Sequence, residues 1–329
     1  MKFQEIGVLC ALLLEIFIFW MICPEVTNPR TGELESSFLT TDNLLRIIHN
    51  ISTVGIAAVG GTLVIISAGI DLSVGSLIGL TDVVTGHFLS HGYSIAVAAS
   101  AALLAGSLVG LVNGSLIAFL GLPPFIATLG MLSIARGLAF WITGGLTISG
   151  ILRNDPWANY LGNGHLLGVP VPVFAMAGVA LVGWMILTRS AFGRRVVALG
   201  GNEDATRFSG VNVQSLKMAI YTLAGLSAAI AGVFYACRYG YASSTAGRGY
   251  ELEVIAAVVI GGTSLSGGRG TILGTMIGAT IMGCLRVGLV TCGAMDQFIE
   301  LAIGSVIILA VLVDVLQNRM KRRGGIART

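Results

Sequence analysis

Residues 94–117 read SIAVAASAALLAGSLVGLVNGSLI, a run of 24 positions that contains no charged side chain. A helix of about 20 apolar residues is long enough to cross the hydrocarbon core of a bilayer. Within this run Gly106, Gly110 and Gly114 recur every fourth position, and small residues at that spacing let helices approach closely in lipid. The run therefore predicts a membrane-spanning helix that packs tightly against a neighbour.

The rest of the chain has the same character. Of its 329 residues, 55% are hydrophobic and 11% are charged, whereas soluble domains carry about 25% charged residues. Apolar runs predict about ten spans, with boundaries accurate to a few residues. They lie near 6–23, 51–69, 74–90, 94–117, 124–143, 172–188, 218–237, 251–262, 271–291 and 297–315. The sequence thus predicts an all-α fold, a polytopic transmembrane bundle that forms a single domain, 1–329.

The distribution of basic residues predicts the orientation of the bundle. With ten spans, both termini lie on the same side of the membrane. That side would carry twelve of the 19 Lys and Arg residues, and the other side would carry five. Cytoplasmic loops are enriched in Lys and Arg, so both termini are expected in the cytoplasm. Residues 316–329 would then form a basic cytoplasmic tail near anionic lipid headgroups. We interpret 6–23 as a retained first span, because no small-residue cleavage site is evident.

Two glycine-containing stretches interrupt the apolar pattern. They are Gly69–Ser76, GIDLSVGS, and Gly261–Gly270, GGTSLSGGRG, and their Leu-Ser pairs lie 193 positions apart, as in a weak internal repeat. Paired interruptions of this kind indicate a transport pathway. Irregular backbone at membrane depth is tolerated where it is buried in protein or lines a cavity. We therefore expect broken helices at both stretches.

Polar residues in and near the broken segments are candidates for a translocation pathway. Asp71 is the strongest, because ionisable groups within membranes are costly and often functional; it could also cap a helix by accepting the N–H of Ser73 or Val74. Asp82, Glu300, Arg136 and Arg286 also carry charge at membrane depth, and the two arginines serve either a pathway or a structural interhelical pair. The candidate pathway residues are Asp71, Ser73, Arg136, Thr263, Ser264 and Arg286.

The sequence contains no recognisable catalytic or nucleotide-binding motif. Residues 265–268, LSGG, resemble the signature of ABC-type ATPases, but none of the three lysines follows a glycine, so the phosphate-binding loop G-x-x-x-x-G-K-[ST] is missing. The five cysteines are odd in number and suggest neither a disulfide framework nor a metal site. A net charge of +3 implies no nucleic-acid role. We expect a protein that is not an enzyme and that needs no cofactor or metal.

The polar stretch Thr188–Lys217 is a candidate docking segment. Asn202 or Gly201 could cap a short helix with two acidic residues in its first turn, and Gly210 would end it. An ordinary solvated connection would have a similar composition. Residues 189–217 are therefore predicted to be a cytoplasmic coupling loop, with candidate contacts Asn202, Glu203, Asp204, Ala205, Arg207 and Gly210.

Five motifs, taken together, resemble a known family. They are Gly69–Ser76, Pro124–Gly130, Gly201–Gly210, Gly249–Glu253 and Gly261–Gly270, and they follow the family order between Phe38 and Asp314. They are similar to the membrane permease subunits of ribose-type, carbohydrate-uptake bacterial ABC sugar importers, in the branched-chain-permease-like superfamily. Branched-chain amino acid permeases differ at Gly69–Ser76, which favours the sugar branch.

The resemblance implies a multi-pass permease of the bacterial inner membrane that imports a monosaccharide, a ribose-like pentose or a hexose. It implies a cytoplasmic ABC ATPase subunit that binds the ATP, an extracytoplasmic sugar-binding protein, and a second permease subunit, identical or different. The segment from Glu203 to Gly210 would dock on the ATPase. Residues 144–171 and 238–250 would form part of the outer mouth.

Three other classes compete with an importer permease. A secondary transporter would work without an ATPase and usually carries relays of acidic or histidine residues within the membrane, whereas the deep carboxylates here are few. A channel or structural membrane protein would leave the docking loop unexplained. A membrane-embedded enzyme would need a catalytic constellation, which the sequence lacks.

Overall fold

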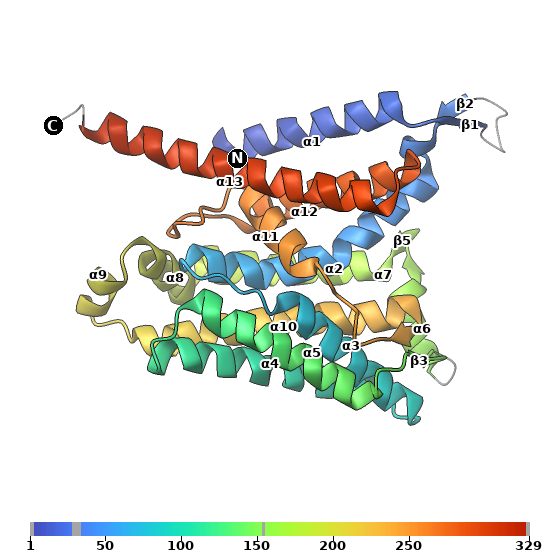
Figure 1. Ribbon diagram of the computed structural model, residues 1–329, viewed down its shortest axis with the longest axis horizontal. Helices are drawn as coiled ribbons and strands as arrows, with labels where there is room; N and C mark the ends of the chain where they lie inside the picture. Colours follow the sequence, from blue (N-terminus) through green and yellow to red (C-terminus); the bar gives the residue numbers. More distant parts are fainter. Residues whose placement is uncertain (1–2, 28–33, 153–154, 327–329) are drawn as a thin grey trace.

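The computed structural model describes residues 3–27, 34–152 and 155–326 of the chain, and most of them lie in helices. The long helices form a bundle and run along one common direction (Figure 1). The helices are α1 (Phe3–Ile22), α2 (Thr41–Ile66), α3 (Val74–Ser90), α4 (Ile95–Phe119), α5 (Pro124–Thr143), α6 (Pro156–Asn163), α7 (Val171–Arg189), α8 (Ala191–Gly201), α9 (Glu203–Phe208), α10 (Val213–Tyr239), α11 (Tyr250–Ile260), α12 (Ile272–Thr291) and α13 (Asp296–Ile326).

The two ends of the bundle differ in structure (Figure 1). One end, which we call the strand end, carries α6 and three short antiparallel pairs: β1 (Glu25–Thr27) with β2 (Leu34–Ser36), β3 (Ile148–Ser149) with β6 (Tyr241–Ala242), and β4 (His165–Leu166) with β5 (Val169–Pro170). The opposite end, which we call the arm end, carries α8 and α9. The β3–β6 pair joins the two segments predicted to form an outer mouth, 144–171 and 238–250.

Seven helices among the described residues are long and apolar enough to cross a bilayer: α1, α2, α4, α5, α7, α10 and α12. Helix α3 and the stretch Gln297–Leu312 of α13 are apolar but shorter. Helix α11 has 11 residues, and at 1.5 Å per residue it covers about half of the hydrocarbon core. The polytopic helical fold is confirmed, and each predicted span coincides with a helix. Ten full-length spans are not confirmed.

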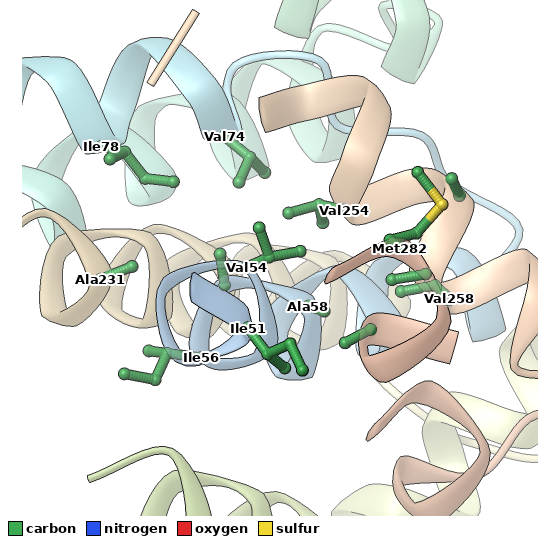
Figure 2. Packing of buried hydrophobic residues seen from close by; sticks show 14 of the residues in the cluster. Ile51, Val54, Ile56, Ala58, Val74, Ile78, Ala231, Val254, Val258 and Met282 are labelled. Atoms are coloured by element: carbon green, nitrogen blue, oxygen red, sulfur yellow. The ribbon is translucent and has the colours of Figure 1, made fainter. Parts of the chain in front are cut away.

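Helix α2 forms the centre of the bundle. It packs against α7, α10, α11 and α12, and its residues from Ile51 to Ile66 are buried. Figure 2 shows side chains of α2 in one apolar cluster with Val254 of α11 and Met282 of α12. The helix begins at Thr41 rather than near residue 51, because the hydroxyl of Thr40 accepts the N–H of Asn43 at 3.3 Å and caps the helix.

The glycine-rich run in α4 packs directly on α10. A Cβ at Gly106 would lie 2.7 Å from the carbonyl oxygen of Gly225, and a Cβ at Gly114 would lie 2.7 Å from the Cα of Met218. These contacts confirm the close packing predicted from the glycine spacing. They leave the helix backbones no room for larger side chains at these positions.

A disulfide at the strand end corrects one prediction. Cys23, after α1, is bonded to Cys292, after α12, and their Cα atoms lie 4.7 Å apart. The expectation that the cysteines form no disulfide framework is wrong for this pair. The two residues are separated by 269 positions, and packing of α1 against α12 brings them together, so spacing along the chain carried no signal.

The predicted basic tail, 316–329, is helical as far as Ile326 and continues α13 without a break. Residues 327–329 of the tail lie outside the described residues. Figure 1 shows this part of α13 extending beyond α1 at the arm end, about as far as α9.

Candidate functional site

The segment after β6, residues 243–249, turns back from the strand end and leads to the start of α11 inside the bundle (Figure 1). We call it the clamped segment. The guanidinium of Arg136 in α5 donates to the carbonyl oxygens of Ser244 at 2.7 Å and Ala246 at 2.6 Å. Hydrogen bonds from charged donors are stronger than neutral ones. Arg136 therefore fixes the path of the clamped segment through its backbone.

Helix α3 provides the other contact surface for the clamped segment. The Oδ2 atom of Asp82 accepts the backbone N–H of Ser243 at 2.9 Å. A Cβ at Gly79, one turn earlier, would lie 2.6 Å from the carbonyl oxygen of Ala246, so glycine there lets the backbone lie against the helix. Two charged residues that the sequence placed at membrane depth thus hold one segment, although the sequence did not identify the partner of either.

Asp71 lies in the first broken segment, where α2 has ended and α3 begins within the bundle. It is buried, and its Oδ1 atom accepts the backbone N–H of Ser73 at 2.8 Å and the Ser73 hydroxyl at 2.6 Å. The side chain of Asn113 in α4 donates to the Ser73 hydroxyl oxygen at 3.0 Å. The hydrogen bond predicted from the N–H of Ser73 to Asp71 is present, although Ser73 itself is the N-cap residue of α3. A pathway role stays a prediction.

At the arm end, the second broken segment meets the end of α2, directly before the first broken segment. The backbone N–H of Gly268 donates to the carbonyl oxygen of Ile66 at 2.8 Å. Gly200 of α8 is buried against the same pair, and a Cβ on it would lie 2.6 Å from the nitrogen of Gly268. A Cβ at Gly267 would lie 2.8 Å from that of Ala68. We call this meeting point of residues 66–68, 200 and 267–268 the glycine junction.

Thr263 and Ser264 lie in the same loop as Gly267. The backbone N–H of Ser264 donates to the carbonyl oxygen of Arg269 at 3.0 Å, and the N–H of Gly267 donates to the carbonyl oxygen of Ser264 at 3.0 Å. The hydroxyl of Thr263 is buried without a hydrogen-bond partner in the described part of the chain. The loop is therefore closed by backbone bonds.

Arg286 of α12 lies in an interhelical ion pair. Its Nη2 atom contacts the buried carboxylate of Glu253 in α11 and lies 3.5 Å from the carboxylate of Glu300 in α13. The structure thus contains the interhelical pair that the sequence left open for Arg286. Its role in a pathway is not tested by this arrangement.

The polar stretch between α7 and α10 contains two helices, where the sequence predicted one. The unpredicted helix α8 begins after Ser190, whose hydroxyl accepts the N–H of Gly193 at 3.0 Å. The predicted helix α9 begins after Asn202, whose Oδ1 accepts the N–H of Ala205 at 2.9 Å. Gly210 has a φ of +81° and follows the end of α9, as predicted. Helix α8 was not predicted because only Ser190 separates it from α7, and no glycine or proline marks the boundary between the two helices.

Charged side chains fix α9 to the start of α10. The carboxylate of Glu203 accepts from Lys217 at 2.7 Å and from Arg207 at 3.1 Å. Asp204 and Ala205 are exposed on the same short helix. Glu203 therefore orients α9, while its neighbours present a surface to solvent.

Helix α9 carries a highly exposed aromatic side chain that was not among the predicted contacts. Phe208, the last residue of α9, has 89% of its surface exposed. Aromatic side chains are enriched among the few residues that dominate protein interfaces. Its position beside the acidic first turn was visible in the sequence, but its exposure depends on how α9 projects from the bundle.

The predicted pathway residues do not form one site. Asp71 and Ser73 lie together, Thr263 and Ser264 belong to the loop beside the glycine junction, and the two arginines hold separate contacts at the clamped segment and the α11–α12 pair. Within the described ranges, no group of three or more His, Cys, Asp or Glu side chains is arranged to hold a metal ion.

The fold and these contacts define a class: a polytopic helical membrane protein with two interior helix starts, α3 and α11, and a short helical arm outside the bundle. Residues 43–316 match the family described as the branched-chain amino acid transport system permease component, and the chain belongs to this family. It is a multi-pass protein of the bacterial inner membrane and a transport subunit.

Curated relatives share the length of the chain. The ribose import permease protein RbsC of Escherichia coli K12 is 45% identical over 85% of this chain and 88% of its own. The fructose import permease protein FrcC of Rhizobium meliloti is 39% identical over 85% and 80%. The D-allose transport system permease protein AlsC of Escherichia coli K12 is 34% identical over 96% and 93%. No solved structure matches the chain.

Proposed function

We propose that this chain is the transmembrane permease subunit of an ATP-driven ABC importer for a monosaccharide, a ribose-like pentose or a hexose. The observation that carries this is the likeness to ribose, fructose and allose permeases over at least four fifths of each chain. The exposed helix α9, held out from the bundle by the Glu203 ion pairs, supports it.

The proposed orientation places the arm end in the cytoplasm and the strand end outside, with ten membrane segments and both termini cytoplasmic. Arg189, Arg194 and Arg195 lie at or next to α8, in agreement with the enrichment of basic residues in cytoplasmic loops. In this orientation, 189–217 is the coupling loop and 316–329 is the cytoplasmic tail. The disulfide at Cys23 then lies on the outer side, where oxidising conditions let disulfides persist.

The proposed importer has the partners of its family, an ATPase subunit and an extracytoplasmic substrate-binding protein. We further propose a second permease subunit, either a copy of this chain or a relative. ATP binds the ATPase subunit, and this chain needs no cofactor of its own. The contacts proposed for the ATPase are Asn202, Glu203, Asp204, Ala205, Arg207 and Gly210, with Phe208 added because of its exposure.

In the proposed mechanism the binding protein delivers the sugar to the mouth formed by 144–171 and 238–250, which the β3–β6 pair joins. Closure of the ATPase subunits on ATP moves α9. The bundle then alternates between access from the strand end and access from the arm end, around α3 and α11. Asp71, Ser73, Arg136, Thr263, Ser264 and Arg286 remain the proposed pathway residues.

The proposal is tested by purifying the tagged chain gently from its native membrane and identifying its companions by mass spectrometry. We expect a stoichiometric ATPase with a phosphate-binding loop. Reconstituted vesicles should then take up sugar only with ATP and the binding protein. Uptake by this chain alone, without ATP, would contradict the proposal and establish a secondary transporter.

The sugar is identified in the same vesicles by competition. Uptake of labelled ribose, labelled fructose and labelled allose is measured separately, each with an excess of unlabelled ribose, fructose or allose. Because sites that hydrogen-bond each hydroxyl reject analogues that lack one, we expect one sugar to compete far better than the others. No ATP-dependent uptake of any of the three would exclude ribose, fructose and allose as the substrate.

A further inference from the structure

The glycine junction joins three segments of the chain through backbone atoms. One hydrogen bond connects the second broken segment to the end of α2, three residues before the first broken segment, from the N–H of Gly268 to the carbonyl oxygen of Ile66 at 2.8 Å. Gly200, the second-to-last residue of α8, lies directly over this bond, and a Cβ on Gly200 would overlap the carbonyl oxygen of Ile66. Glycine is therefore required at 200 for the three segments to meet.

Helix α8 is fixed to the bundle on the side that carries Gly200. Val196 and Leu199 are fully or almost fully buried in the same apolar cluster as Ile66. The neighbouring Gly201 is exposed, and a Cβ there would meet no atom within 4 Å. Of these two adjacent glycines, Gly200 has no space for a Cβ between Ile66 and Gly268, whereas a Cβ on Gly201 would point into open space.

We propose that Gly200 is a positioning residue through which movement of α9 reaches both broken segments at once. From Ile66 the chain continues through Asp71 to the interior start of α3. From Gly268 it runs back through Thr263 to the end of α11. This inference rests on the proposed function, because it takes the ATPase to be the partner that moves α9.

Backbone contact suits this role because it transmits displacement directly. A long side chain at the junction could change rotamer and absorb a small shift, whereas close-packed backbone atoms pass it on. A cavity of about 220 Å³ lies beside the junction, bordered by Glu5 of α1, Val197 of α8 and residues 268–271. The loop that carries Gly268 therefore has space on one side into which it can move.

The decisive experiment compares Gly200→Ala with Gly201→Ala in the complete complex with its ATPase and binding protein. We measure sugar uptake per ATP hydrolysed in reconstituted vesicles. Gly200→Ala should still co-purify with the ATPase and hydrolyse ATP, while uptake per ATP falls about tenfold, as for substitutions within a coupling network. Gly201→Ala should resemble the wild type. Normal uptake per ATP in assembled Gly200→Ala would overturn the inference.

If the Gly200→Ala variant does not assemble, a second pair of less disruptive substitutions, Gly268→Ala and Gly121→Ala, tests the inference. A Cβ at Gly268 would lie 3.2 Å from the Cα of Gly201, and Gly268 has a φ of +73°. Gly121 has a φ of +67° at the same end of the bundle, with no atom within 4 Å of its added Cβ. Gly268→Ala should lower uptake per ATP and Gly121→Ala should not; equal effects would show backbone strain alone and overturn the inference.

These outcomes are separable from failure of the proposed function. If the wild-type chain brings no ATPase with it, the proposed function fails before any variant is made. If the wild-type complex transports sugar with ATP and the glycine variants behave as their controls do, only the role of Gly200 fails.

Discussion

The clamped segment and the glycine junction both hold irregular backbone inside or at the end of a helical bundle, but they do so with different groups. At the clamped segment, charged side chains from α3 and α5 reach the backbone of residues 243–249. At the glycine junction, backbone meets backbone, and Gly200 and Gly268 lie close to Ile66. One region depends on side chains being present, and the other depends on a side chain being absent.

This difference predicts opposite sensitivities to mutation. Truncating a side chain should damage the clamped segment, because carbonyl oxygens inside a bundle lose their donors. Adding a methyl group should damage the glycine junction, because close-packed backbone has no space for it.

Arg136→Ala should break the clamped segment. It removes two hydrogen bonds from a charged donor, at 2.7 and 2.6 Å, and we expect the free energy of unfolding to fall by about 3 kcal/mol with loss of uptake. Arg136→Lys is the control, since a single nitrogen of Arg136, Nη1, donates to both carbonyls; an ammonium group keeps the charge and several donors but sits on a shorter side chain, so this variant should be intermediate. Thermal unfolding in detergent and vesicle uptake measure both; an alanine variant equal to wild type would contradict the clamp.

Phe208→Ala tests whether the exposed surface of α9 binds the ATPase, as the proposed movement of the glycine junction requires. Because 89% of Phe208 is exposed, the substitution should leave folding nearly unchanged. ATPase binding should weaken by about 2 kcal/mol, roughly 30-fold, if Phe208 is an interface anchor. Binding is measured by titrating the ATPase onto permease in nanodiscs.

The control for Phe208 is Leu301→Ala, which truncates another exposed apolar side chain, on α13. It should bind the ATPase as the wild type does. Equal affinity for the Phe208→Ala and Leu301→Ala variants would exclude Phe208 from the docking surface.

Asp71→Asn tests the first broken segment, which leads from the glycine junction to α3, the helix that contacts the clamped segment. Asparagine keeps an acceptor oxygen for the N–H of Ser73, so the free energy of unfolding should change by no more than about 1 kcal/mol. A pathway carboxylate would lose its charge, and we expect severalfold slower uptake at an unchanged thermal midpoint. Uptake equal to that of the wild type would leave Asp71 as a helix cap alone.

Cys23→Ser should have the smallest effect on uptake, because the disulfide lies away from both regions. Loss of a disulfide typically lowers stability by about 2–4 kcal/mol, so the thermal midpoint should fall while uptake persists. Cys10→Ser, at an exposed free cysteine, should change neither. Counting thiols in the unfolded wild type before and after reduction checks the bond directly; an unchanged count would contradict it.

The sequence by itself determined the features that depend on neighbouring residues. Apolar runs located the helices because a bilayer selects for continuous hydrophobicity. The cap at Asn202, the end near Gly210 and the hydrogen bond from Ser73 to Asp71 were predictable because each involves groups within a few positions. The glycine spacing in α4 predicted close packing for the same reason.

Tertiary structure decided what depends on residues far apart in the chain. Arg136 and Asp82 were visible as charges at membrane depth, but their shared segment follows β6, more than 100 positions later. The pairing of Cys23 with Cys292 and the meeting of Gly200 with Ile66 and Gly268 also arise from helix packing. A hydrophobic pattern specifies which residues are buried, but it is non-directional. Close packing and directional hydrogen bonds determine which buried residues contact one another, and these interactions form only when the bundle folds.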